Sequence, residues 1–109
     1  MKKTILLTIG LLAAGLTAAQ AADAKENWEK NCAKCHGADG KGQTTMGKKL
    51  KVKDYTDAKV QAEFKDADAI KITKEGKKEG DKTLMKAYAE VLSDQEIKDL
   101  VAFVRKFKQ

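Results

Sequence analysis

Two thiols and an imidazole lie together near the start of the chain, at Cys32, Cys35 and His36. Thiols at this spacing can form thioether bonds to the two vinyl groups of a haem. The imidazole directly after the second thiol then falls under the iron as its proximal ligand, and this arrangement is a signature of c-type haem attachment. The segment therefore predicts one covalent haem c and a protein that moves electrons.

Two cysteines separated by two residues also occur in zinc sites and in redox-active dithiols. A structural zinc ion takes four ligands, whereas the chain has two Cys and one His, so a carboxylate would have to join them. A redox dithiol usually begins a helix in a βαβ setting, and no alternation of strands and helices is evident. A disulfide across these four residues would close too small a loop to stabilise much. None of these alternatives requires the histidine.

The first 21 residues have the pattern of an export signal. Lys2 and Lys3 provide a positive start, an apolar run follows from Ile5 to Leu16, and Ala19-Gln20-Ala21 is a small-x-small cleavage site. The apolar run is shorter than the roughly 20 residues that span a bilayer. We predict a signal peptide at residues 1–21, cleaved to leave residues 22–109 in a bacterial periplasm. The alternative is an uncleaved N-terminal anchor.

The predicted mature chain is small for a stable core. Charged residues make up 35% of the whole sequence and aromatic residues 6%, and a chain of this size buries only a little over about 60% of its unfolded surface. A haem bonded in the middle would supply apolar core, as small scaffolds usually need. With no proline, repeat or linker evident, residues 22–109 are predicted to form one all-α domain.

The last helix has the clearest signal. Ser93 to Glu96 form a capping box, and the apolar residues after it fall on one helical stripe: Ile97, Leu100, Val101 and Val104, widened by Phe103 and Phe107. Helices are also predicted at residues 24–35, at 57–64 with Thr56 as N-cap, and from an Asp66 cap to Gly76. Residues 48–55 are predicted to be irregular, and 76–86 to be a basic loop.

A haem held by His36 needs a ligand on the other face of its iron. Met46 and Met85 are the candidates, because Met1 belongs to the predicted signal. Thioether sulfur suits electron transfer, and a Met/His pair raises the reduction potential. Met46 lies only ten residues past His36, a short reach around the ring edge, so the sequence favours Met85. A lysine ligand or an open site is the alternative.

The chain resembles the class I c-type cytochromes of bacteria over residues 24–107. The likeness rests on five motifs: Cys32 to Gly42 (CHGxxGxG), the aromatic Trp28, Leu100 with Phe103, Gly47 with Leu50, and Met85 to Tyr88. The resemblance implies three to five helices wrapped around one haem, with His36 and Met85 as axial ligands of a six-coordinate iron.

Two prolines of the family pattern are absent. Lys48 stands where relatives have the proline after Gly47, and Lys86 where they have the proline after the ligand methionine. In relatives the carbonyl at the first position accepts a hydrogen bond from the proximal histidine and tunes its basicity. Lys48 still offers a carbonyl for that bond, on a less rigid loop. Lys86 leaves Met85 freer, which predicts easier loss of this ligand at alkaline pH.

The chain is basic, with a net charge of +6 that becomes +4 when Lys2 and Lys3 are removed, leaving 20 basic and 16 acidic residues. Lysines flank both predicted haem-facing loops and could form a rim that steers an acidic redox partner. The alternative is that they only solvate the surface. Nucleic-acid binding is not expected. The candidate docking lysines are Lys41, Lys48, Lys49, Lys77, Lys78 and Lys86.

Taken together, the sequence predicts a soluble, monomeric electron carrier in the periplasm that passes single electrons between respiratory or dehydrogenase partners. The two cysteines tether the haem and the axial ligands close its iron to substrate, so the protein itself is not expected to be an enzyme. Two other functions remain open. One is an open-site haem protein that binds a gas or reduces peroxide, and the other is a haem-free dithiol oxidoreductase.

Overall fold

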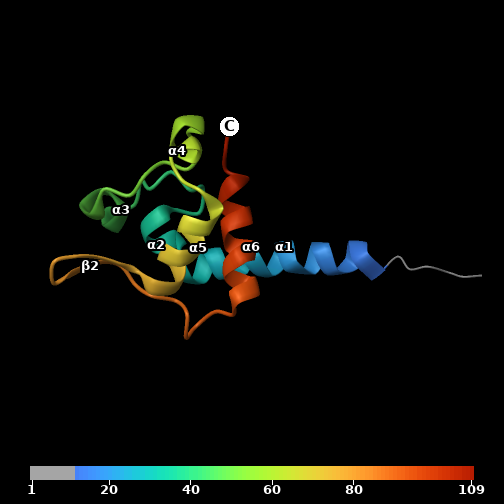
Figure 1. Cartoon of the computed structure of the whole chain (residues 1–109). Helices are drawn as coiled ribbons and strands as arrows, with labels where there is room; N and C mark the ends of the chain where they lie inside the picture. Colours follow the sequence, from blue (N-terminus) through green and yellow to red (C-terminus); the bar gives the residue numbers. More distant parts are fainter. Residues whose placement is uncertain (1–11) are drawn as a thin grey trace, which may run out of the picture.

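The computed structural model describes residues 12–109, in which several short helices lie around one crossing of two longer ones (Figure 1). Residues 1–11 of the predicted signal lie outside the described residues, and α1 runs through the predicted cleavage site. Among residues 12–109, every helix is too short or too polar to cross a membrane. The elements are α1 (Leu12–Asn31), α2 (Ala33–His36), α3 (Thr45–Leu50), α4 (Ala58–Ala62), α5 (Asp66–Glu75), β1 (Lys77–Glu79), β2 (Lys82–Met85) and α6 (Asp94–Arg105).

The core lies where α6 crosses the C-terminal half of α1 (Figure 1). Trp28 of α1 is only 3% exposed and packs against Leu100 of α6, which is equally buried. The ring centres of Phe103 and Phe107 lie 5.8 and 5.2 Å from the centre of the Trp28 ring. The predicted apolar stripe of the last helix therefore faces the first helix, and the mostly helical fold expected from the sequence is confirmed.

The predicted capping box is present at the start of α6. The Ser93 hydroxyl accepts a hydrogen bond from the Glu96 backbone N–H at 3.1 Å, and the Glu96 carboxylate accepts one from the Ser93 N–H at 3.0 Å. These bonds also lower the pKa of Glu96, and the side-chain amide of Asn27 on α1 contributes to the same shift. The capping box thus fixes the start of α6, and the hydrogen bond from the Asn27 side chain to the Glu96 carboxylate, at 3.0 Å, joins this end of α6 to α1.

The predicted loop at residues 76–86 is wrong, because most of it forms an antiparallel hairpin of β1 and β2. Lys77 is paired with Met85, and a bulge separates this pair from the next. Gly80 makes the reversal at a φ of +60°, which glycine adopts without strain. The strands are too short and too rich in lysine for their sequence to show a strand pattern, so only pairing between them reveals the hairpin.

Three helix boundaries also differ from the prediction. Thr45–Leu50 is helical rather than partly irregular, because the Thr44 hydroxyl accepts a hydrogen bond from the Gly47 N–H at 2.8 Å and caps α3. Asp57, rather than Thr56, caps α4, and the Thr56 hydroxyl donates to Asp54 instead. Lys65 occupies the N-cap position of α5, and Asp66 begins the helix. The starts of α4 and α5 move by one residue each, within the reach of competing caps, whereas α3 is a helix that was not predicted. The helix predicted at residues 24–35 is divided into α1 and α2, which are separated at Cys32.

Arg105 ties the end of α6 to the segment between α4 and α5. Its guanidinium donates to the carbonyl oxygens of Gln61 and Phe64 at 2.5 and 2.8 Å and to the Asp66 carboxylate at 2.8 Å. It also lies 4.0 Å from the centre of the Phe64 ring. The side chain of Gln61, itself buried, donates to the carbonyl oxygens of Tyr55 and Val104. This network sets the position of Phe64, which faces the cavity described below.

Gly47 is required because backbone surrounds the space that a side chain would take. A Cβ atom at this position would collide with the carbonyl oxygens of Cys35 and Gly42. We therefore expect Gly47→Ala to lower the free energy of unfolding by roughly 1–3 kcal/mol, as overpacking does. Chemical denaturation followed by circular dichroism measures this change.

Gly80→Asn is the matched control for that substitution. A Cβ at Gly80 would meet nothing within 4 Å, and asparagine tolerates a positive φ better than most residues. We expect its free energy of unfolding to stay within about 0.5 kcal/mol of the wild-type value. Equal losses in the two variants would contradict the crowding argument.

Candidate functional site

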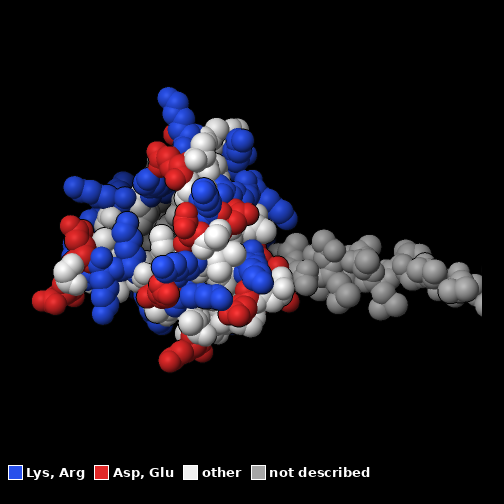
Figure 2. All heavy atoms as spheres, viewed as in Figure 1, with Lys and Arg blue, Asp and Glu red and all other residues white. Residues whose placement is uncertain are grey.

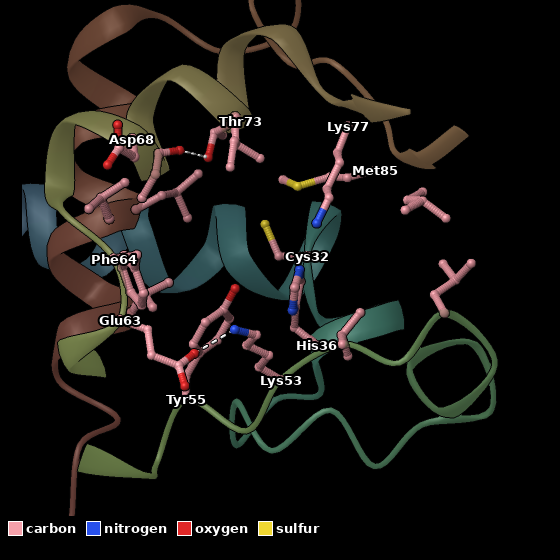
Figure 3. Close-up of a pocket in the computed structure, with 18 of the residues that line it drawn as sticks. Cys32, His36, Lys53, Tyr55, Glu63, Phe64, Asp68, Thr73, Lys77 and Met85 are labelled. Carbon is pink, nitrogen blue, oxygen red and sulfur yellow. Dashed lines mark hydrogen bonds and ion pairs between the residues drawn. The ribbon is translucent and has the colours of Figure 1, made fainter. Parts of the chain in front are cut away.

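One cavity of about 320 Å³ lies between the end of α1, α5, α6, the hairpin and the chain that follows α3 (Figure 3). Its wall is largely apolar, and the apolar residues come from segments far apart in the sequence. They include Val52, Phe64, Ile72, Leu84 and Leu100. This volume lies in the usual range for sites that bind small molecules or cofactors.

Three of the four predicted haem-site residues line this cavity: Cys32, His36 and Met85. Cys32 follows the last turn of α1, and its backbone N–H donates to the Trp28 carbonyl at 2.9 Å. The Cys32 carbonyl in turn accepts from the N–H of His36 at 2.9 Å, so one turn of helix places the thiol and the imidazole side by side. In Figure 3 both point into the cavity, while the Met85 sulfur enters from the hairpin.

The remaining predicted residue, Cys35, lies on α2, is half-buried and is not part of the cavity wall. Neither Cys35 nor Cys32 forms a disulfide. Met46, the other candidate for the second axial position, lies on α3 and does not line the cavity either. The hairpin, and not α3, therefore brings a thioether to the side of the cavity away from α2.

His36 is held as a neutral ring. Burial lowers the pKa of the imidazole, because a charged ring would lose its hydration. Its Nδ1 atom is buried and has no hydrogen-bond partner among the described residues. The expected bond from His36 to the carbonyl of Lys48 is therefore absent. A neutral imidazole keeps a lone pair on one nitrogen, which is the form that binds metals.

Cys32 is a poor nucleophile in this fold. Burial raises the pKa of its thiol to about 12, and the charge of the nearby Cys35 adds to the increase. Redox-active dithiols need the opposite, a thiol whose pKa is lowered so that the thiolate forms near neutral pH. The raised pKa of Cys32 therefore gives no support to the haem-free dithiol alternative. Among the residues that the structure describes, no group of three or more His, Cys, Asp or Glu side chains is placed to hold a metal ion.

Several polar residues of the cavity wall were not among the predicted site residues. Lys53 and Glu63 form an ion pair of 2.5 Å at its edge, and Asp68 and Thr73 line it from α5. The spacing of Asp68, Ala69, Ile72 and Thr73 places them on one face of a helix, and this pattern could have found the α5 residues. The Lys53–Glu63 pair joins two separate segments, so no pattern of neighbouring residues in the sequence could have predicted it.

The predicted docking lysines are spread over three segments. Figure 2 shows basic side chains gathered over α3 and the hairpin, with acidic ones at the hairpin tip. Of the six candidates only Lys77 lines the cavity, whereas Lys51 and Lys53, which were not predicted, also line it. The others are outside its wall: Lys41 before α3, Lys48 and Lys49 on α3, Lys78 on β1 and Lys86 just after β2.

The residues at this site fit a covalently bound haem. The cavity is apolar, its wall carries one thiol with a second three residues away, and a buried neutral imidazole has a ring nitrogen without a partner among the described residues. A thioether stands on the hairpin side. Two thiols, one imidazole and one thioether are the protein groups that a c-type haem takes.

The sequence pattern of the cytochrome c family matches residues 21–108 of the chain. Among solved structures, the fold is similar to the KustC0563 c-type cytochrome, with 34% sequence identity and a TM-score of 0.72, over 80% of this chain and 99% of that one. A tyrosine-to-phenylalanine mutant of Kustc0563 is similar too, with 35% identity and a TM-score of 0.69, over 79% and 99% of the two chains. The search of curated proteins returned no match.

Proposed function

Since this chain belongs to the cytochrome c family, whose members are usually electron carriers rather than enzymes, we propose that it carries single electrons through one covalent haem c bound in the cavity. The observation that carries the proposal is that Cys32 and His36, from one short motif, line the same apolar cavity as Met85, which was predicted from a distant part of the sequence. When bound, the haem supplies the one-electron couple of its iron.

Four residues hold the haem in this proposal. Cys32 and Cys35 would form the two thioether bonds, and His36 and Met85 would supply a nitrogen and a sulfur ligand to the iron. The apolar wall would keep water away from the haem, and Phe64, held by Arg105, is part of that wall. With both ligands bound, the iron would have no free position for a substrate, and the protein would transfer electrons without catalysing a reaction.

The proposed location is the bacterial periplasm. Residues 1–21 act as the export signal and are removed after Ala21, which leaves residues 22–109 as the working protein. Support for this location comes from the signal pattern and from the chemistry of the site, because thioether bonds to Cys32 and Cys35 are formed after export of the chain. N-terminal sequencing of the purified protein tests the cleavage site.

The proposed partners are respiratory or dehydrogenase proteins with acidic docking surfaces. The side chains over α3 and the hairpin are mostly basic (Figure 2), and Lys51, Lys53 and Lys77 extend this charge to the cavity wall. A positive field around the cavity would steer an anionic surface toward the haem and would weaken as salt is added. The protein acts as a monomer in this proposal.

Reversing two charges on α3 should slow electron transfer to an anionic reagent. In the Lys48→Glu/Lys49→Glu variant we expect the second-order rate constant with ferricyanide at low ionic strength to fall on the order of 10-fold, because steering is lost. Stopped-flow absorbance measures the rate. The difference should shrink as the salt concentration rises.

Lys30→Glu/Lys98→Glu is the charge-matched control, since it makes the same change in net charge on exposed residues of α1 and α6. We expect this pair to slow the reaction much less. Equal slowing by the two pairs would mean that only net charge matters, and the proposed docking surface would then be wrong.

A visible absorption spectrum tests the proposed function as a whole. The full chain is produced with its export signal in a bacterium that matures c-type cytochromes, and the purified protein is examined in both oxidation states. A sharp low-spin spectrum with the long-wavelength sulfur-to-iron band supports the electron carrier. High-spin bands would support the open-site haem protein instead. A colourless protein with two titratable thiols would refute haem binding.

A further inference from the structure

Two aromatic rings from different elements lie against the His36 imidazole. The Trp28 ring, from α1, has its centre 5.5 Å from the centre of the imidazole, with 35° between the planes. The Tyr55 ring, from the segment between α3 and α4, has its centre 5.4 Å away, with 32° between the planes. Both distances are those of direct ring contacts between aromatic side chains.

Hydrogen bonding does not set the direction of this imidazole. Nδ1 of His36 is buried and has no partner among the described residues. In most metal sites a histidine ligand donates its second ring N–H to a carbonyl or a carboxylate, and that bond fixes the rotation of the ring. At His36 the rings of Trp28 and Tyr55 are in a position to restrict this rotation instead.

Both aromatic neighbours are themselves firmly anchored. The indole N–H of Trp28 donates to the carbonyl of Gly37, directly after His36, at 2.9 Å, and the ring is packed against Phe103 and Phe107. The backbone N–H of Tyr55 donates to the Gly40 carbonyl at 2.8 Å, and its own carbonyl accepts from the Gln61 side chain at 2.7 Å. Neighbours held this tightly can fix the orientation of a ring that lies against them.

We propose that Trp28 and Tyr55 are positioning residues, which set the plane of the proximal imidazole by ring packing in place of a hydrogen bond to its Nδ1. This inference rests on the proposed function, because it concerns His36 as a haem ligand. The plane of an axial imidazole determines how unpaired spin spreads over the porphyrin. The four haem methyl resonances of the oxidised protein therefore respond to the rotation of the ring, together with the orientation of the Met85 sulfur.

The test is proton NMR of the oxidised holoprotein, together with its melting temperature. Tyr55→Leu removes one of the two rings, and we expect it to change the order and the spread of the four haem methyl shifts. Tyr55→Phe keeps the ring and should restore the wild-type pattern. Trp28→Phe removes the indole N–H and part of the contact area, and a change in the same resonances is expected.

Phe107→Leu is the matched control, because Phe107 packs against Trp28 but is not in ring contact with His36. We expect it to lower the melting temperature and to leave the methyl pattern unchanged. A wild-type pattern in Tyr55→Leu, or an equal change in Phe107→Leu, would overturn the inference. If Trp28→Phe does not fold, the comparison of Tyr55→Leu with Tyr55→Phe tests the inference by itself. Loss of haem from the wild-type protein would instead refute the proposed function.

Discussion

Replacing both Cys32 and Cys35 by alanine is expected to give a protein that keeps no haem after denaturation. The two thiols are the chain's only cysteines, so without them nothing can form a thioether bond to a vinyl group. We also expect most of the helical signal to be lost at physiological temperature. The buried residues are few and the chain is small, so the haem has to supply part of the core.

Haem staining of a denaturing gel measures the covalent link, and far-ultraviolet circular dichroism measures the folding. Each single variant, Cys32→Ala or Cys35→Ala, leaves one vinyl group unreacted, so its absorption bands should move to longer wavelength while some haem stays attached. Lys34→Ala, at the exposed position between the two thiols, is the control and should match the wild type. A double variant that keeps its haem through denaturation would contradict the proposed attachment.

Replacing Met85 by leucine should open the sixth position of the iron. We expect the long-wavelength sulfur-to-iron band to disappear, high-spin features to replace it, and the reduction potential to fall by tenths of a volt, because axial ligands set haem potentials over a range of about 0.8 V. Leucine nearly conserves the volume of methionine, so packing should contribute less than about 1.5 kcal/mol to the change in the free energy of unfolding. Loss of the iron–sulfur bond adds to this change. Spectroelectrochemistry measures the spectrum and the potential together.

Met46→Leu is the matched control, because Met46 does not line the cavity. Its spectrum and potential should equal those of the wild type. Lys77 also lines the cavity, and its amine points inward in Figure 3, so it could bind the iron in place of the lost sulfur. The double variant Met85→Leu/Lys77→Ala should therefore be made as well. A Met85→Leu protein with the wild-type sulfur band, or a Met46→Leu protein without it, would reject Met85 as the ligand.

The features that the sequence predicted well depend on neighbours along the chain. The spacing of Cys32, Cys35 and His36 is local, and so is the capping box at Ser93 and Glu96, which the structure contains. The apolar stripe of α6 follows from helical periodicity, and it does face Trp28. The family resemblance was carried by the same short motifs, and the match over residues 21–108 confirms it.

The features that the sequence missed depend on contacts between distant segments. The hairpin of β1 and β2 forms because two short lysine-rich strands pair with each other, and neither strand alone has a strand pattern. The sequence pattern could not predict that Asp57 rather than Thr56 caps α4, because both residue types are good N-caps. In the structure the Thr56 hydroxyl donates to Asp54 instead.

By itself, then, the sequence determined which residues could hold a haem and how the last helix begins, since short-range spacing and capping fix both. The sequence already favoured Met85 over Met46, but only the tertiary structure decided how Met85 reaches the cavity and how the His36 ring is held. Met85 reaches it because the hairpin carries it to the cavity wall, and His36 lies against Trp28 and Tyr55 with no partner for its Nδ1 among the described residues. Such outcomes depend on how segments pack, and packing is not encoded in the spacing of nearby residues.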